Sequence, residues 1–174
     1  IYCPTPGPTD LYMSKICLEL AEKIPNLPFV FYGSPTKLTE IFNGVPKNVE
    51  DIGRTTPEGC SHVYDDISCV LRLCTHDGNP VGGIEALQRG LNVVENFPYE
   101  GFICPTEDVW DQGQHKKACT VDAVERVLID EKTHEINTGP FPAYYRERCS
   151  PENFGKEVKC AISSSLHPLS QTTE

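Results

Sequence analysis

Apolar residues recur at helical spacing in two stretches of the chain. From about residue 10 to residue 24 they follow a 3.6-residue period, with Thr9 or Asp10 in place to cap a helix. A second helix is expected to begin at Pro80, after the turn-forming segment 77–80, and to end at Gly90. Between them, Ser34-Pro35 predicts a short helix that ends at Asn43-Gly44.

Short runs of apolar, β-branched and aromatic residues predict strands. The expected strands span 28–32, 67–74, 91–94, 101–104 and 126–130, and a hairpin loop at 130–133 leads into 134–138. Segment 46–61 is expected to be a loop, and the Ser/Thr-rich residues from 163 onward lack any period and are predicted to be disordered. The order of the elements, with helices first and strands later, predicts an α+β fold.

Nine single cysteines change the picture, because a chain in a reducing compartment has little use for so many thiols. The sequence has no Cys-x-x-Cys pair, so the spacing favours disulfides over a structural metal site. The chain begins without Met or a hydrophobic leader, which we interpret as a mature secreted form. An odd count leaves one cysteine free, or paired with a small thiol or with another chain. We expect a monomer with one cysteine left unpaired.

The net charge of −10 argues against tight binding of nucleic acid or of anionic membranes. No apolar run is long enough to span a bilayer. We therefore expect an extracellular protein without a membrane anchor, metal or cofactor, with at most weak affinity for RNA.

Four segments in the second half resemble the fungal guanyl-specific ribonucleases. They are Cys74-Thr-His-Asp-Gly-Asn-Pro with the helix ending at Gly90, Phe97-Pro-Tyr-Glu-Gly-Phe102, Val124-Glu-Arg-Val-Leu-Ile-Asp130, and Ile136-Asn-Thr-Gly139 followed by Cys149. The resemblance covers about residues 70–150. It implies a helix packed on a twisted antiparallel sheet and a disulfide between Cys74 and Cys149.

This resemblance divides the chain into three parts. Residues 1–69 are an N-terminal extension with a helix, a strand and a helix. Residues 70–160 form the ribonuclease-like domain, and residues 161–174 form a disordered tail.

The chain departs from that family at the positions where catalysis takes place. The two catalytic histidines of the family fall on Val94 and Asn137, and a tyrosine falls near Asn92. Only Arg126 stands at its expected place. The catalytic carboxylate falls on Glu107 by gap placement or on Gln112 by strict counting.

Several residues remain as site candidates beside structural alternatives. If the protein cleaves RNA, Arg126 would act with Glu107, Glu100 or His134. Tyr99 and Glu100 could read a base edge, or simply pack a turn between strands. Tyr144, Tyr145 and Arg146, next to Arg148, form an aromatic and basic patch suited to a partner, or a solvated strand edge.

The loss of catalytic residues predicts a non-enzymatic function. We expect a secreted effector of a plant-pathogenic fungus, a virulence protein that binds a host protein or is recognised by a host receptor. One alternative is an active endoribonuclease with a rearranged site. A remote alternative is a toxin similar to ADP-ribosyltransferases, on the basis of Phe29-Val-Phe-Tyr-Gly-Ser and the helix after it, although the strand lacks the Arg or His of that family.

Overall fold

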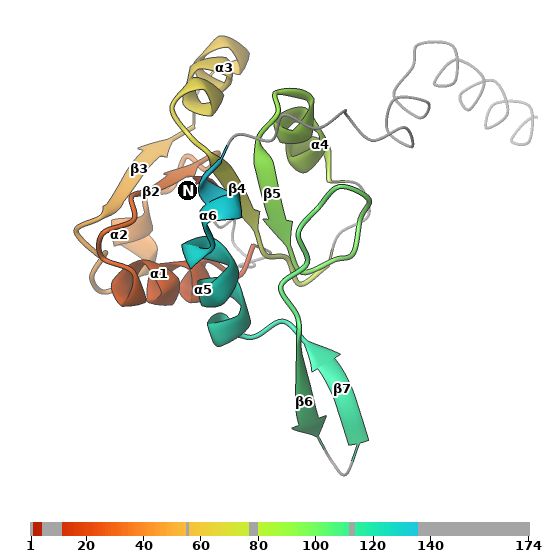
Figure 1. Cartoon of the computed structure of the whole chain (residues 1–174). Helices are drawn as coiled ribbons and strands as arrows, with labels where there is room; N and C mark the ends of the chain where they lie inside the picture. The colour runs from red at the N-terminus through yellow and green to blue at the C-terminus, as the bar shows by residue number, and fades with distance from the viewer. Residues whose placement is uncertain (1, 5–11, 55, 77–79, 112–113, 136–174) are drawn as a thin grey trace, which may run out of the picture. The chain divides into compact units, whose positions relative to one another are not determined.

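The computed structural model describes residues 2–4, 12–54, 56–76, 80–111 and 114–135, which belong to one compact unit spanning Ile1–Gly139 (Figure 1). Along the chain the elements are β1 (Tyr2–Pro4), α1 (Ser14–Lys23), β2 (Phe29–Tyr32), α2 (Leu38–Ile41), β3 (Val49–Gly53), α3 (Pro57–Asp65), β4 (Cys69–Arg72), α4 (Val81–Gln88), β5 (Asn92–Glu95), β6 (Glu107–Asp111), β7 (Gln114–Ala118), α5 (Val121–Ile129) and α6 (Glu131–His134).

The main sheet has five strands in the order β3-β2-β1-β4-β5, and every neighbouring pair is parallel. The chain moves outward from β1 to β3, then crosses over to β4 on the other side of β1. The mixed helix and strand content agrees with the predicted fold class, but the predicted antiparallel sheet is wrong. Parallel strands need crossover connections, which are usually helical, and the four connections here contain α1, α2, α3 and α4.

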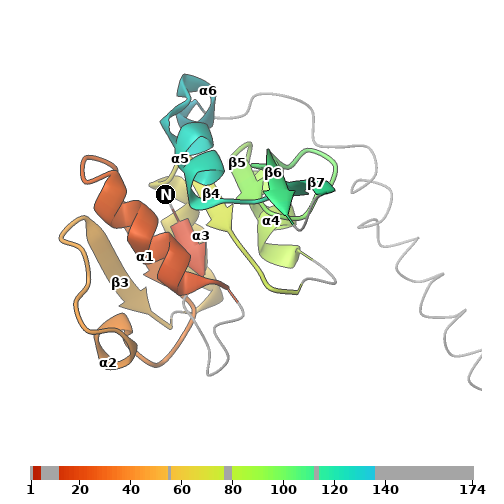
Figure 2. The ribbon, with the colours of Figure 1, turned by 90° about the horizontal axis from the view of Figure 1, so that it is seen from below.

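Most of the core lies between one face of this sheet and two helices. Phe31, Leu71 and Val94 are fully buried there against Leu20 of α1 and Leu128 of α5. The helices α1 and α5 lie side by side (Figure 2). On the opposite face α4 packs on β4 and β5, so both faces of the sheet are covered.

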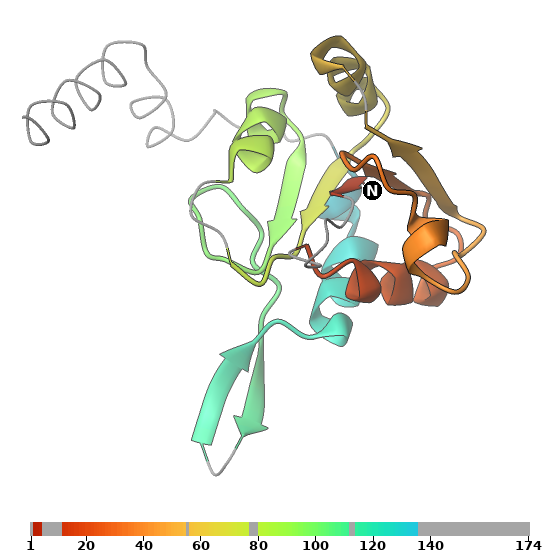
Figure 3. The ribbon, with the colours of Figure 1, turned by 180° about the vertical axis from the view of Figure 1, so that it is seen from behind.

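Strands β6 and β7 form a separate two-stranded antiparallel hairpin (Figure 3). The sequence pattern did not predict it. Among the described residues beyond β5, only an isolated parallel bridge between Val94 and Ile103 adds to the main sheet, where a strand over 101–104 was expected.

Local structure confirms the helices expected near residues 10–24, 34–43 and 80–90, and the strands at 28–32, 67–74 and 91–94. Three other predictions are wrong. Segment 46–61 holds β3 and the start of α3, and residues 126–129 of the predicted strand 126–130 lie in α5. The hairpin loop predicted at 130–133 holds most of α6. Thr120 caps α5 by accepting a hydrogen bond from the Ala123 amide at 3.1 Å. This cap marks the start of the helix, which the short apolar run at its end does not indicate.

The predicted boundary between residues 69 and 70 falls at the start of β4, inside the five-stranded sheet. Cys17, Cys69, Cys104 and Cys119 are free thiols. Cys149, the predicted partner of Cys74, lies outside the described residues, as does the predicted tail. No helix in the described part of the chain is both long and apolar enough to cross a membrane.

Candidate functional site

The strand order points to one edge of the main sheet. In open parallel sheets, ligands bind outside the carboxyl ends of the strands, where the strand order reverses. Here the reversal lies between β1 and β4, and helices α1 and α4 begin just beyond those two strands. We refer to this region, which comprises Tyr12 to Ser14, Arg72 to His76, Pro80 to Gly83 and the end of β5, as the carboxyl-edge site.

The helices that begin at this site differ from the other long helices at their first turns. The helices α3 and α5 are capped by the side chains of Thr56 and Thr120. By contrast, α1 begins after Met13 and α4 after Pro80, and neither of these residues caps its helix through a side chain. The amides of an uncapped first turn carry a partial positive charge and are available to an anion.

Two glycines make up most of the first turn of α4. The amide of Ile84 is the first to bond within the helix, to the carbonyl of Pro80 at 2.9 Å. A Cβ on Gly83 would lie 2.6 Å from the ring of Phe102 and 3.4 Å from Val93, so glycine allows α4 to pack closely at this point. A Cβ on Gly82 would meet only the Tyr64 hydroxyl, at 3.8 Å, so this position is open.

A buried ion pair lies at the carboxyl ends of β4 and β5. Arg72 and Glu95 end β4 and β5, stand opposite each other in the sheet register, and are joined by a hydrogen bond of 2.8 Å. Their side chains are 11% and 0% exposed. The ring of Tyr12, half-buried, lies 5.5 Å from the Arg72 guanidinium carbon. The guanidinium is therefore balanced by a carboxylate and contributes little free positive charge.

The segment after β4 is held in place by one side chain from the segment after β5. Asn96 accepts a hydrogen bond from the Cys74 amide and donates one to the Cys74 carbonyl, both at 2.8 Å. These two bonds fix the start of the connection that leads from β4 into α4.

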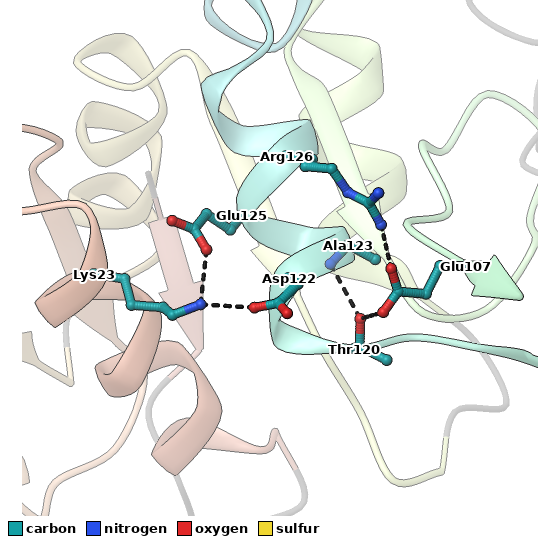
Figure 4. Close-up of polar contacts among 7 residues, drawn as sticks. All are labelled: Lys23, Glu107, Thr120, Asp122, Ala123, Glu125 and Arg126. Carbon is teal, nitrogen blue, oxygen red and sulfur yellow. Dashed lines mark hydrogen bonds and ion pairs between the residues drawn. The ribbon is translucent and has the colours of Figure 1, made fainter. Parts of the chain in front are cut away.

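The structure brings together two of the residues that the sequence singled out. Arg126 of α5 forms an ion pair with Glu107 of β6, and Glu107 also accepts a hydrogen bond from the Thr120 hydroxyl (Figure 4). The Arg126 side chain is 66% exposed. This pair ties the base of the hairpin to the first turns of α5.

A second ionic contact in the same view joins α1 to α5. The Lys23 ammonium lies 2.7 Å from Asp122 and 2.8 Å from Glu125 (Figure 4). The hydrogen bond from Lys23 lowers the pKa of the Asp122 carboxyl, and the two carboxylates raise the pKa of Lys23. We interpret these contacts as structural, because the Lys23 ammonium and the two carboxylates pair with one another at the surface and join α1 to α5.

The other predicted candidates do not join Arg126. Glu100 is an exposed turn residue, and Tyr99 packs edge-on against Phe102 with ring centres 5.6 Å apart. His134 is exposed in α6. The remaining candidates, Gln112, Asn137, Tyr144, Tyr145, Arg146 and Cys149, lie outside the described residues.

Two positions that the resemblance matched to catalytic residues are structural. Val94 is fully buried in β5. Asn92 begins the same strand and donates hydrogen bonds to the carbonyls of Thr133 and Glu135, at 3.3 and 2.5 Å. These bonds fasten the end of α6 to the sheet.

Sequence reasoning missed the carboxyl-edge site. The available signal was a charged residue next to apolar runs: Arg72 follows Val70-Leu71, and Glu95 follows Val93-Val94. Charged residues are rarely fully buried without a partner, so two such positions on adjacent strands indicate a pair.

Comparison with known proteins gives a fold and no family. No family model and no curated protein matches the chain. The similar solved structures include one of the GtfA/B complex, with 13% identity over 95% of this chain and a TM-score of 0.53. They also include one of the pneumococcal O-GlcNAc transferase GtfA in complex with UDP and GlcNAc, with 18% identity over 90% of this chain and a TM-score of 0.53. The chain spans about a third of each (35% and 33%).

These similarities and the parallel sheet overturn the predicted function. One of these similar structures is an O-GlcNAc transferase and neither is a ribonuclease, so the predicted ribonuclease-like scaffold is wrong, and so is the fungal virulence effector built on it. The endoribonuclease and ADP-ribosyltransferase alternatives fall with it. The sequence resemblance over residues 70–150 and the secreted location stay predictions. Nothing in the structure bears on a host protein or receptor as partner.

Proposed function

We propose that this chain is a Rossmann-like domain of the glycosyltransferase type, and that it binds a nucleoside-diphosphate sugar at the carboxyl-edge site. One observation carries the proposal: the helices that flank the reversal of strand order, α1 and α4, are the long described helices without a side-chain cap. The similarity to a transferase solved with UDP and GlcNAc supports this choice of ligand.

A diphosphate suits the two uncapped helix ends. Each first turn offers backbone amides to phosphate oxygens, and the helix dipole favours negative charge at that position. The net charge of −10 makes such local positive ends more important, because the protein as a whole repels anions. Since Arg72 is paired with Glu95, the phosphates would contact amides rather than this guanidinium.

The same amides would assist the transfer reaction. When the bond between the sugar and the diphosphate breaks, negative charge grows on the leaving diphosphate. Amides that are already oriented stabilise this charge without rearrangement. In this proposal Tyr12 offers an aromatic wall beside the ligand, and the hydrogen bonds of Asn96 to Cys74 keep the segment before α4 from moving.

Val81 allows a direct test, because it is the first residue of α4 and 52% exposed. In Val81→Glu, a carboxylate at the helix N-terminus stabilises the helix by about 0.3–1 kcal/mol but repels a bound diphosphate. We expect Val81→Glu to weaken UDP binding, measured by titration calorimetry, at least about tenfold, or about 1.4 kcal/mol. Val81→Gln, the neutral control of similar size, should bind UDP like the unaltered chain.

Ile129→Glu is a second control, because it adds the same charge at an exposed position on α5. It should leave UDP affinity nearly unchanged. The proposal fails if the unaltered chain does not bind UDP, or if Val81→Glu and Val81→Gln bind it equally well. Thermal unfolding of each variant separates a loss of binding from a loss of folding.

A further inference from the structure

Two half-buried cysteines stand at the base of the β6–β7 hairpin. Cys104 precedes β6 and Cys119 follows β7 directly. The first pair of the hairpin ladder joins Glu107 to Ala118. The Thr120 hydroxyl donates to Glu107, so contact between the two chain segments continues past the end of the ladder.

Both segments also lie against the main core. Ile103, next to Cys104, bridges to Val94 of β5, and both Ile103 and Cys119 pack on the core cluster. Cys104 and Cys17 of α1 both lie near enough to Cys119 to raise the pKa of its thiol. Thiols from three separate parts of the sequence are therefore neighbours in this region.

The three thiols differ in access to solvent. Cys17 is 1% exposed and belongs to the core cluster, whereas Cys104 and Cys119 are partly exposed. A reagent from solution therefore reaches the two hairpin-base cysteines and not Cys17. No group of three or more potential metal ligands occurs among the residues that the structure describes, so the arrangement favours thiol chemistry over metal binding.

We propose that Cys104 and Cys119 are a thiol–disulfide pair that forms a bridge across the base of the hairpin by exchange with a small-molecule disulfide such as oxidised glutathione. One thiolate attacks the glutathione disulfide, giving a mixed disulfide and one reduced glutathione. The second thiolate attacks the protein sulfur of the mixed disulfide and releases the second glutathione. The protein loses two protons and two electrons, and the small disulfide gains them.

The surroundings of the pair slow the exchange at neutral pH. Burial, with the nearby Cys104 and Cys17, raises the pKa of the Cys119 thiol to about 11, and burial with Glu95 raises the pKa of Cys104. Because the thiolate is the attacking species, bridge formation should be faster at pH 9 than at pH 7.

The bridge can be tested on the full folded chain by peptide mapping. The protein is incubated with oxidised glutathione, free thiols are alkylated, and the chain is cut after Lys and Arg. Cys104 then lies in peptide 90–116, Cys119 in 118–126 and Cys17 in 16–23, so each pairing gives a different linked mass. We expect a linked 90–116/118–126 product that disappears with a reducing agent.

Serine variants provide the controls. Cys17→Ser should leave the linked product intact, whereas Cys104→Ser and Cys119→Ser should each remove it and leave the other cysteine alkylated or joined to glutathione. The proposal is overturned if Cys119 links to Cys17, if Cys104 and Cys119 each carry only glutathione, or if both remain free. Because this result does not depend on nucleotide binding, it stands or falls separately from the proposed function.

Discussion

At the carboxyl-edge site, Gly83 packs closely against Phe102, and the neighbouring Gly82 is an open position that serves as a reference for a stability prediction. Replacing a helical glycine by alanine stabilises a helix by about 1 kcal/mol. At Gly83 the new Cβ would lie 2.6 Å from the Phe102 ring, and crowding of this kind costs about 1–3 kcal/mol. At Gly82 the nearest atom is 3.8 Å away, so only the gain applies. We therefore expect Gly83→Ala to be about 1–3 kcal/mol less stable than Gly82→Ala.

Urea unfolding followed by circular dichroism measures this difference. Gly82→Ala should raise the free energy of unfolding above that of the unaltered chain, and Gly83→Ala should lower it or leave it unchanged. Replacing the Phe102 ring by the smaller leucine should relieve the crowding. The Gly83→Ala substitution should therefore cost less free energy of unfolding in the Phe102→Leu background than in the unaltered chain. Equal stability of the two alanine variants would refute the close packing of α4 on Phe102.

Two further predictions concern buried groups. Glu95→Gln leaves the Arg72 charge without its carboxylate and should lower the free energy of unfolding by about 3–5 kcal/mol. The double variant Arg72→Met/Glu95→Met should recover most of that loss in the same urea assay. Equal losses in the two variants would mean that the pair is not coupled. Burial raises the pKa of Cys69 to about 12 from an ordinary value of about 8.5. The folded state then holds this proton more tightly than the unfolded state, so stability should be constant below about pH 8.5 and fall as the pH rises toward 12, by at most about 1.4 kcal/mol per pH unit. Cys69→Ala should show a smaller fall, and identical pH profiles would contradict this origin.

The sequence predicted helices and buried strands better than it predicted their arrangement. The run at 28–32 and the period before it were sufficient for β2 and α1, because each carries its pattern over adjacent residues. The short apolar run Val127-Leu128-Ile129 fits a strand or a helix equally well. The Thr120 cap, six residues before the predicted strand, favours the helix, because it satisfies an amide of the first helical turn.

The predicted antiparallel sheet rested on the family resemblance and not on the order of helices and strands along the chain. Strands that alternate with helices favour a parallel sheet, and the alternation is interrupted only if 46–61 is taken as a loop. Once β3 and α3 occupy that segment, the alternation is complete from β1 to β5.

The carboxyl-edge site could not be read from local pattern alone. The residues Arg72 and Glu95 are 23 positions apart, and their pairing depends on the register of β4 against β5. Likewise, the absence of side-chain caps on α1 and α4 indicates a site only once the strand order shows that both helices begin at the same edge of the sheet. The pair of Arg126 with Glu107, which the sequence did single out, serves to join the hairpin to α5.

The neutral character of the Arg72–Glu95 pair has a consequence for ionic strength. Sites that hold phosphates with free Lys and Arg side chains lose affinity as salt is added, because salt screens the attraction. In the proposed site the positive groups are helix amides, and the net charge of the protein, −10, repels an anion. Added salt would screen mainly this repulsion, so a diphosphate ligand would keep or gain affinity where most phosphate-binding proteins lose it.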